Sequence, residues 1–259
     1  MEGILSGKVA LITGGSRGIG RAISKTLALN GAKVIINYLN NHDAANSLVD
    51  ELAQQGASVE IIQAHIGDPT SRKELWDRFD TISDRLDFFI ANAAIGVFKP
   101  LEQLSSNSFK KVLSINLESF LDLSHGAISR MKKKDKTYEG ERGRIIAISS
   151  MGASRTIPDY GSVACIKAGV ESMIRQYAFE LGGEGINCNV VRAGLVDTGL
   201  LDYVSGKSDI ISSTINSTPT GRMTTPEDVA GVVKFLLTRD SRMITGQTIV
   251  VDGGYSIKA

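Results

Sequence analysis

The chain has 259 residues, of which 42% are hydrophobic and 22% charged, proportions typical of a soluble globular protein. Its 29 basic and 28 acidic residues leave a formal net charge of +1, which argues against a dedicated nucleic-acid surface. No apolar run approaches the roughly 20 residues of a membrane helix, and the first residues lack the pattern of a signal peptide. Cys165 and Cys188 suit reduced buried thiols and lack metal-ligand spacing. We therefore expect a cytoplasmic protein with no metal site, no nucleic-acid partner and no membrane association.

Short apolar runs alternate with longer amphipathic ones along the chain. Runs rich in Val and Ile that are apolar on both faces are typical of parallel strands covered on both sides. They predict strands at residues 8–13, 33–37, 58–65, 86–91, 144–149, 186–191 and 248–252. Helical periodicity predicts helices at residues 20–30, 44–55, 73–85, 109–131, 167–182 and 226–238. This alternation predicts one α/β domain over residues 1–259, with a doubly wound parallel sheet of about seven strands and helices on both faces.

Residues 195–218 break this alternation directly after a predicted strand. The segment is polar and contains several Gly and Ser residues. A long segment at such a position is often a lid over the substrate, although an ordinary surface loop is the alternative. We predict a substrate lid.

A glycine-rich turn joins the first predicted strand to the first predicted helix. It reads Thr13-Gly14-Gly15-Ser16-Arg17-Gly18-Ile19-Gly20. Glycines permit a tight turn and let backbone N–H groups approach a pyrophosphate at the positive end of a helix. A glycine-rich turn alone often serves packing, but its place between a strand and a helix predicts a dinucleotide site. The spacing of Gly14, Gly18 and Gly20 differs from the G-x-G-x-x-G pattern.

This spacing resembles that of the short-chain dehydrogenase/reductase family, and further segments match the family in order. Asn92-Ala93-Ala94 resembles the family's Asn-Ala-Gly, Asn116 its helical active-site Asn, and Ser150 its catalytic serine. The resemblance implies a Rossmann-type fold, a nicotinamide cofactor and a homotetramer. A segment after the sixth strand is similar to the one that contacts the nicotinamide and diphosphate, although Ala193 stands where proline is usual. The implied cofactor-binding residues are Gly14, Ser16, Arg17, Gly18, Ile19, Gly20, Asn37, His65, Ile66, Asn92, Ala93, Lys167, Gly194, Val196 and Thr198.

The residues after the second predicted strand indicate which nicotinamide cofactor is used. An NAD site usually places a carboxylate there for the ribose 2′-OH, whereas this chain has Asn37-Tyr38-Leu39-Asn40-Asn41. Arg17 lies in the glycine turn, where a guanidinium pairs well with a 2′-phosphate, unless it simply faces solvent. His65-Ile66 replaces the family's usual aspartate near the adenine, so His65 either donates to the base or is a surface histidine. We predict NADPH as the cofactor.

The tyrosine of the family's active site is displaced in this chain. Family members usually carry Tyr-x3-Lys thirteen residues beyond the serine, and that position is Val163 here. The lysine is present as Lys167, but the tyrosine is Tyr160, three residues earlier. Seven residues advance an α-helix by about 700°, close to two turns, so both side chains would lie on one face if the stretch is helical. The alternative is that Tyr160 is a turn residue in a degenerate site.

The displacement has a chemical interpretation. In ketone reduction, the carbon that accepts the hydride also carries the oxygen that needs a proton. In reduction of an enoyl thioester, hydride goes to the β-carbon and negative charge develops on the thioester oxygen two carbons away. A proton donor for that oxygen should therefore lie elsewhere. The Tyr-x6-Lys spacing resembles that of enoyl-acyl-carrier-protein reductases on this fold, most of all the NADPH-dependent group III.

This resemblance implies roles for four catalytic residues. Tyr160 would hydrogen-bond or protonate the enolate oxygen, and Lys167 would hold the nicotinamide ribose and lower the pKa of the tyrosine. Ser150 would orient the thioester carbonyl, and Asn116 would support Lys167. We predict reduction of the trans-2 double bond of enoyl thioesters, linked to acyl carrier protein or CoA, in fatty-acid or related acyl-chain synthesis. The alternatives are a reductase of 3-ketoacyl thioesters or other carbonyls and, more remotely, a non-catalytic NADPH-binding module.

Overall fold

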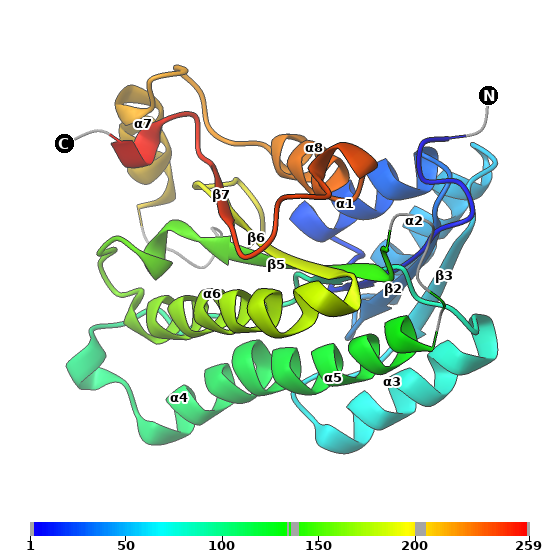
Figure 1. Cartoon of the computed structure of the whole chain (residues 1–259). Helices are drawn as coiled ribbons and strands as arrows, with labels where there is room; N and C mark the ends of the chain where they lie inside the picture. The colour runs from blue at the N-terminus through cyan, green and yellow to red at the C-terminus, as the bar shows by residue number, and fades with distance from the viewer. Residues whose placement is uncertain (1–2, 134, 136–139, 200–205, 258–259) are drawn as a thin grey trace.

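One parallel sheet forms the centre of the molecule in this computed structural model, which describes residues 3–133, 135, 140–199 and 206–257. Within these residues, seven strands pair in parallel in the order β3-β2-β1-β4-β5-β6-β7 (Figure 1). The strands are β1 (Val9–Thr13), β2 (Lys33–Tyr38), β3 (Val59–Gln63), β4 (Phe88–Ala91), β5 (Gly143–Ser150), β6 (Ile186–Ala193) and β7 (Thr248–Val251). All seven coincide with predicted strands, and the doubly wound α/β fold is confirmed.

Helices cover both faces of the sheet (Figure 1). On one face lie α1 (Gly18–Leu29), α2 (His42–Ala53) and α8 (Pro226–Leu236). On the other lie α3 (Pro69–Ile82), α4 (Ser106–Leu113), α5 (Ser119–Lys132) and α6 (Gly161–Leu181). Each face has its own apolar core, one built with α1, α2 and α8 and the other with α3, α5 and α6. None of the described helices has both the length and the apolar character needed to cross a membrane.

The structure corrects two helix predictions and adds one helix that was not predicted. The helix predicted over residues 109–131 is divided into α4 and α5 by a π-helical turn, Ser114–Glu118. Helix α6 begins at Gly161 rather than at residue 167. Helix α7 (Lys207–Ser217) lies inside the segment predicted as a lid. Residues 200–205 of that segment are outside the described residues, so its function as a lid stays a prediction.

The sheet topology brings distant segments together at one edge. Chain connections run in opposite directions from β1 and β4, so the carboxyl ends of these neighbouring strands flank a switch point, where ligands bind in open α/β sheets. Thr13, Ala91 and Ser150 end three adjacent strands at this edge. Any cofactor site built from the predicted residues must therefore lie along this line.

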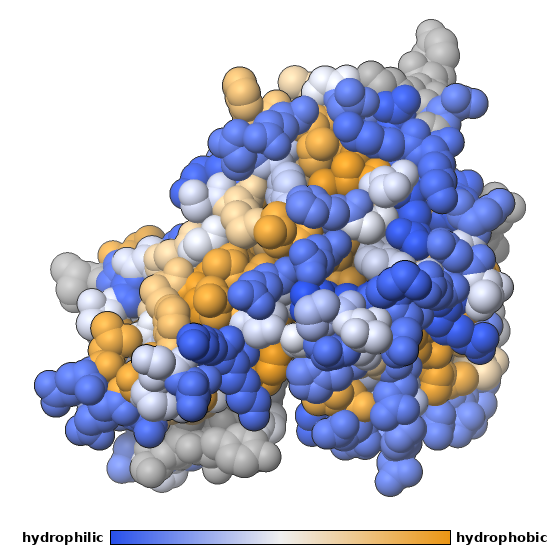
Figure 2. Space-filling view, turned by 90° about the horizontal axis from the view of Figure 1, so that it is seen from below, coloured by the Kyte–Doolittle hydropathy of each residue, from blue (hydrophilic) through white to orange (hydrophobic). Residues whose placement is uncertain are grey.

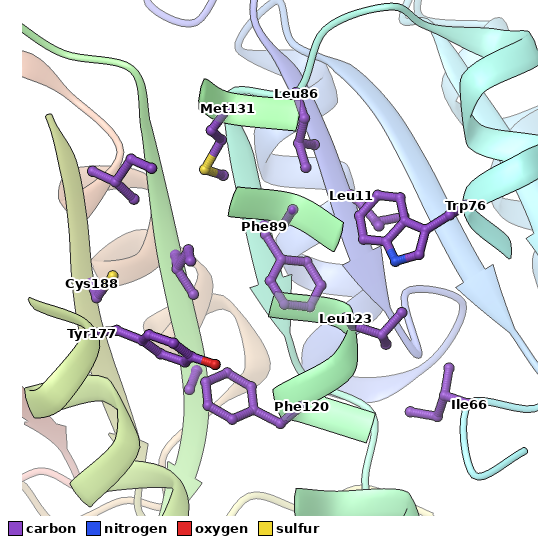
Figure 3. Close-up of a cluster of buried hydrophobic side chains, with 14 of the residues drawn as sticks. Leu11, Ile66, Trp76, Leu86, Phe89, Phe120, Leu123, Met131, Tyr177 and Cys188 are labelled. Carbon is purple, nitrogen blue, oxygen red and sulfur yellow. The ribbon is translucent and has the colours of Figure 1, made fainter. Parts of the chain in front are cut away.

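The core between the sheet and α3, α5 and α6 contains an unsatisfied hydroxyl (Figure 3). The ring of Tyr177 on α6 packs edge-on against Phe120 on α5, with ring centroids 6.1 Å apart. Within the described residues, the Tyr177 hydroxyl is buried and has no hydrogen-bond partner. Burial raises the pKa of Tyr177 to about 12, because the charged phenolate is disfavoured among apolar side chains. The hydroxyl therefore adds a desolvation cost to a ring that packs well.

We predict that Tyr177→Phe stabilises the protein. Removing an unpartnered buried hydroxyl while keeping the ring should raise the free energy of unfolding by about 1 kcal/mol. Thermal unfolding should show this as an increase in Tm of about 2–4 °C. Tyr177→Leu is the control, since it deletes the ring, leaves a cavity and should lower Tm. A lower Tm for Tyr177→Phe would show that the hydroxyl has a stabilising partner.

Candidate active site

The glycine turn after β1 is hydrogen-bonded to the residues that directly follow β4. The side-chain amide of Asn92 donates to the carbonyl oxygens of Thr13 (3.0 Å) and Gly14 (3.1 Å). In return, Thr13 Oγ1 accepts from the backbone N–H groups of Asn92 (3.0 Å) and Ala93 (3.1 Å). A Cβ atom on Gly20 would lie only 2.2 Å from the Gly14 oxygen, so helix α1 can begin this close to the strand only without a side chain at that position. The turn thus forms a tight cradle at a helix N-terminus, the geometry that binds a pyrophosphate.

Two arginines near this turn have different surroundings. Arg17 is the N-cap residue of α1, has extended backbone (φ −141°, ψ 161°) and is exposed. No described residue forms a hydrogen bond or ion pair with the Arg17 side chain in the structure. Arg21, one turn later, donates to the Ala44 oxygen (3.0 Å) and pairs with Glu51 (2.7 Å). Arg17 is therefore the cation at this turn that is available to a ligand.

The end of β2 carries no carboxylate, as predicted. The Asn37 side chain is buried and its amide donates to the Ala64 oxygen (3.0 Å), which ties β2 to the end of β3. Its backbone oxygen accepts from the N–H of Gly15 at 3.1 Å. The Tyr38 hydroxyl lies 2.9 Å from Nδ1 of His42. Asn37 therefore supports the glycine turn mainly through its backbone.

His65 and Ile66 follow β3 and face in different directions. The His65 side chain is exposed, whereas the Ile66 side chain lies in the apolar core (Figure 3). The Ile66 backbone oxygen accepts from Nη1 of Arg72 at 2.7 Å. Only His65 presents a side chain that could reach an adenine.

The segment after β6 lies against the glycine turn. The Gly194 N–H donates to the Val251 oxygen at 2.8 Å, and Val196 forms an isolated bridge with Thr224. A Cβ atom on Gly18 would lie 3.2 Å from Cγ2 of Thr198, which places Thr198 beside the turn. Segments 180 residues apart thus meet at the cradle, where the resemblance places the diphosphate of a dinucleotide.

The displaced tyrosine faces the predicted serine. The Tyr160 hydroxyl donates to Ser150 Oγ at 3.0 Å. Tyr160 is the N-cap residue of α6 (φ −95°, ψ 1°), and its backbone oxygen accepts from the N–H groups of Val163 and Ala164. The stretch from Gly161 to Lys167 is helical, and Tyr160 lies directly before its first turn. Val163, at the usual position of the tyrosine, is buried.

The ring of Tyr160 is held between two residues whose contacts the spacing did not reveal. Phe98, after β4, stacks on the ring with centroids 5.8 Å apart and an interplanar angle of 24°. Gly152 lies against the ring as well, and a Cβ atom there would be 2.5 Å from Tyr160 Cδ1. Both contacts depend on tertiary packing, so no local sequence pattern identifies them.

Lys167 and Asn116 line one small cavity. Lys167 Nζ is buried and donates to the Ile148 oxygen at 2.6 Å. Asn116, in the π-helical turn, bonds the backbone of Ile95 from both ends of its amide, at 2.9 and 2.8 Å. The cavity between Asn116 and Lys167 has a volume of about 10 Å³, close to the space that one water needs. Any support of Lys167 by Asn116 is therefore indirect.

Burial sets the pKa values of both titratable site residues. It lowers the pKa of Lys167 to about 8, against the opposing charge of Glu171. It also raises the pKa of Tyr160 above its ordinary value, and the hydrogen bond with Ser150 offsets only part of that. We expected Lys167 to lower the pKa of this tyrosine, so the structure corrects the direction. The Tyr160 phenol is neutral at pH 7 and can donate a proton.

Comparison with known proteins identifies the family of the chain. The family described as "Enoyl-(Acyl carrier protein) reductase" matches residues 14–256. The chain is 36% identical over 254 residues to a 1-cyclohexenylcarbonyl-CoA reductase of Streptomyces collinus, covering 97% of this chain and 88% of that protein. It is 32% identical to a versicolorin reductase of Emericella nidulans, covering 96% of each chain.

Solved structures show the same likeness. A putative NAD(P)-dependent gluconate 5-dehydrogenase from Beutenbergia cavernae with bound NADP has a TM-score of 0.89 at 29% identity and 98% coverage of both chains. A short-chain dehydrogenase from Burkholderia cenocepacia in complex with NADP has a TM-score of 0.87 at 30% identity, covering 97% of this chain and 99% of that one. The chain therefore belongs to the short-chain dehydrogenase/reductase family and is an oxidoreductase.

Proposed function

We propose that the protein reduces the trans-2 double bond of enoyl thioesters with NADPH, in fatty-acid or related acyl-chain synthesis. The observation that carries this proposal is the Tyr160–Ser150 hydrogen bond at the start of α6, seven residues before Lys167. It gives the site a working proton donor in a displaced position. A relative whose name describes a 1-cyclohexenylcarbonyl-CoA reductase supports a thioester with an unsaturated acyl group. Acyl carrier protein and CoA are both candidate carriers.

The residues at this edge of the sheet fit NADPH. The cradle around Gly20 has no room for a side chain but exposes a helix N-terminus, and Arg17 offers a free cation beside it. Lys167 is buried at the far end of the same edge, where it would hold the ribose of the nicotinamide. When bound, NADPH supplies the hydride. His65 would contact the adenine, and Thr198 the diphosphate.

The side chains of the site then donate the proton and orient the thioester oxygen of the substrate. Tyr160 keeps its proton at pH 7, because burial disfavours the phenolate, and it delivers that proton or a hydrogen bond to the thioester enolate oxygen. Ser150, 3.0 Å away, orients the same oxygen. A neutral phenol suits the reductive direction, which needs a donor, better than the oxidative direction, which needs a base.

Carbonyl reduction is the second candidate function. Relatives named versicolorin reductase and hydroxynaphthalene reductase-like protein favour it, because they share 32% identity with this chain across nearly its whole length. The deciding experiment follows NADPH oxidation with trans-2-enoyl and with 3-ketoacyl thioesters, each as CoA and as acyl-carrier-protein conjugates. Faster turnover of enoyl thioesters supports the proposal. Turnover of 3-ketoacyl thioesters alone would replace it with carbonyl reduction, and turnover of neither would point to a substrate other than these thioesters.

The face formed by α4, α5 and α6 is a candidate subunit interface. Figure 2 shows apolar residues gathered on this face between polar ones. Phe179 on α6 is 87% exposed, and Leu121 on α5 is also exposed. A large exposed apolar area of this kind is typical of association sites. We propose that the protein is a homotetramer and that this face contributes to its assembly.

Arg17→Ala should weaken the use of NADPH and spare that of NADH. Losing one charge-assisted contact with a 2′-phosphate costs about 1.5–3 kcal/mol, or roughly 10- to 150-fold in kcat/KM. Steady-state kinetics with both cofactors measure this. Arg21→Ala is the matched control, because Arg21 is held by Glu51 and should not discriminate between them. Equal losses for NADPH and NADH in Arg17→Ala would show that Arg17 only shapes the turn.

Tyr160→Phe should keep NADPH binding and lower enoyl-thioester turnover by about 10²–10⁴-fold, the range for a lost proton donor. The ring contacts with Phe98 and Gly152 remain, so the loss reports on the hydroxyl. Binding is measured by NADPH fluorescence and turnover by NADPH oxidation. Tyr177→Phe, which removes a hydroxyl outside the site, should leave turnover unchanged. Near-normal turnover in Tyr160→Phe would remove Tyr160 from the mechanism.

The rate should fall as the pH rises above about 8. The pKa of Lys167 is lowered to about 8, so its ammonium group is present below that pH and lost above it. The profile of kcat/KM against pH should therefore descend near pH 8, while Tyr160 stays protonated. Lys167→Arg retains its charge at higher pH and should remove this limb, even if its rate is lower throughout. A wild-type profile that is flat to pH 9.5 would show that the charge of Lys167 is not required.

A further inference from the structure

A buried carboxylate that the proposed reaction does not use lies one helical turn beyond Lys167. Glu171 on α6 is only 4% exposed. Its Oε1 accepts from the Ser149 hydroxyl at 2.6 Å, and Ser149 is the residue directly before Ser150. Of the two adjacent serines, Ser149 is therefore held by Glu171 while Ser150 faces Tyr160.

Arg192 on β6 neutralises the charge of this carboxylate and connects it to a further segment of the chain. Its Nε donates to Glu171 Oε1 at 3.0 Å and its Nη2 to the other carboxylate oxygen, a two-point contact. The remaining nitrogen, Nη1, donates to Ser154 Oγ at 2.8 Å. The Ser154 N–H in turn donates to the Met151 oxygen at 3.0 Å, which closes the 3₁₀ turn Met151–Ala153.

The pair therefore holds the chain on both sides of Ser150. Ser149 is fixed before it, and the turn that places Gly152 against the Tyr160 ring is fixed after it. Charges buried in this way cost free energy unless they are paired and hydrogen-bonded, and here both partners are. Glu171 also favours the charged form of Lys167, which lies on the same side of α6.

We propose that Glu171 and Arg192 are positioning residues, which fix the connection between β5 and α6 so that Ser150 and Tyr160 meet the substrate oxygen. This inference rests on the proposed function, because it assigns the pair to that reaction. It predicts that the pair affects kcat far more than the binding of NADPH.

The test replaces both residues, in Glu171→Met with Arg192→Met. Removing one partner alone would leave an unpaired buried charge and unfold the protein, whereas apolar residues of similar volume often replace a buried pair without loss of stability. We expect a Tm close to that of the wild type, a Kd for NADPH within about twofold, and a kcat lower by about 10- to 100-fold, since a misplacement of about 1 Å is enough for such a loss. The alkaline limb of the kcat/KM profile should move to lower pH, because Lys167 loses the carboxylate that favours its charged form. The double variant also removes the charge of Arg192, so the pair leaves no unpaired charge near Lys167. Tyr160 keeps its proton over this pH range and does not contribute to the limb.

The matched control is Glu141→Met with Arg144→Met, a pair at the opposite end of β5 in which Arg144 is buried and Glu141 is partly exposed. It should leave kcat unchanged. Ser149→Ala is the milder variant if the double replacement does not fold, and it should lower kcat in the same direction. A double variant with the kcat and pH limb of the wild type would overturn the proposal.

A second readout separates this inference from the proposed function. Wild-type rates with enoyl and 3-ketoacyl thioesters decide which reaction is catalysed, and the variants are compared on whichever substrate the wild type reduces. Hydrogen exchange of the backbone at residues 149–154 needs no substrate at all. It should be faster in the double variant than in the wild type and in the control pair. Equal exchange in all three proteins would show that the pair does not position this segment, whatever the reaction is.

Discussion

The hydrogen bonds between Thr13 and Asn92 are the interaction on which the rest of the site depends. With one bond from Asn92 to Gly14 and one from Ala93 to Thr13, they make four contacts of 3.0–3.1 Å that join the ends of β1 and β4 at the switch point of the sheet. Backbone groups at strand ends lose the partners that the sheet gives them, and each must be satisfied when buried. Asn92 satisfies two carbonyls of the turn, and the N-terminus of α1 that follows is the end of a helix that favours an anion. The shape of the proposed cofactor-binding turn thus follows from the hydrogen bonds that join these two strand ends.

Low polarity around Tyr160 and Lys167, the proposed catalytic pair, favours the neutral form of each side chain. The same burial that lowers the pKa of Lys167 raises that of Tyr160, because in each case the charged form is disfavoured. The result is a tyrosine that holds its proton and a lysine whose charge is sensitive to its neighbours. Glu171 is the residue whose charge counteracts the effect of burial on Lys167. A charged group one turn of α6 beyond the proposed catalytic residues therefore affects the charge of the site.

The strands could be predicted because their signal is local. Short apolar runs, most of them rich in Val and Ile, mark the strands, and the glycine turn follows the first of them directly. Helix α7 was missed because its Ser-rich sequence has little apolar periodicity, and the π-helical turn was missed because an extra residue in one turn leaves the pattern nearly unchanged. The pair of Glu171 and Arg192 depends on how α6 packs on β6. The pKa of Tyr160 depends on burial, which spacing does not show.

The displacement of Tyr160 is made possible by the residue before it. Asp159 has a φ of 60°, the left-handed region that few residues other than glycine adopt, and Asp is among those that tolerate it. Its backbone oxygen accepts from the Lys99 N–H at 2.9 Å, in the same loop that carries Phe98 against the Tyr160 ring. Strained backbone of this kind persists only where the surroundings enforce it, and it gathers at functional sites. The loop that contains Phe98 and Lys99 thus contacts both the backbone of Asp159, where the chain turns, and the ring of Tyr160. The tyrosine is directed toward Ser150 by the backbone before α6 rather than by the helix, which is why a shift of three residues still leaves its hydroxyl in the site.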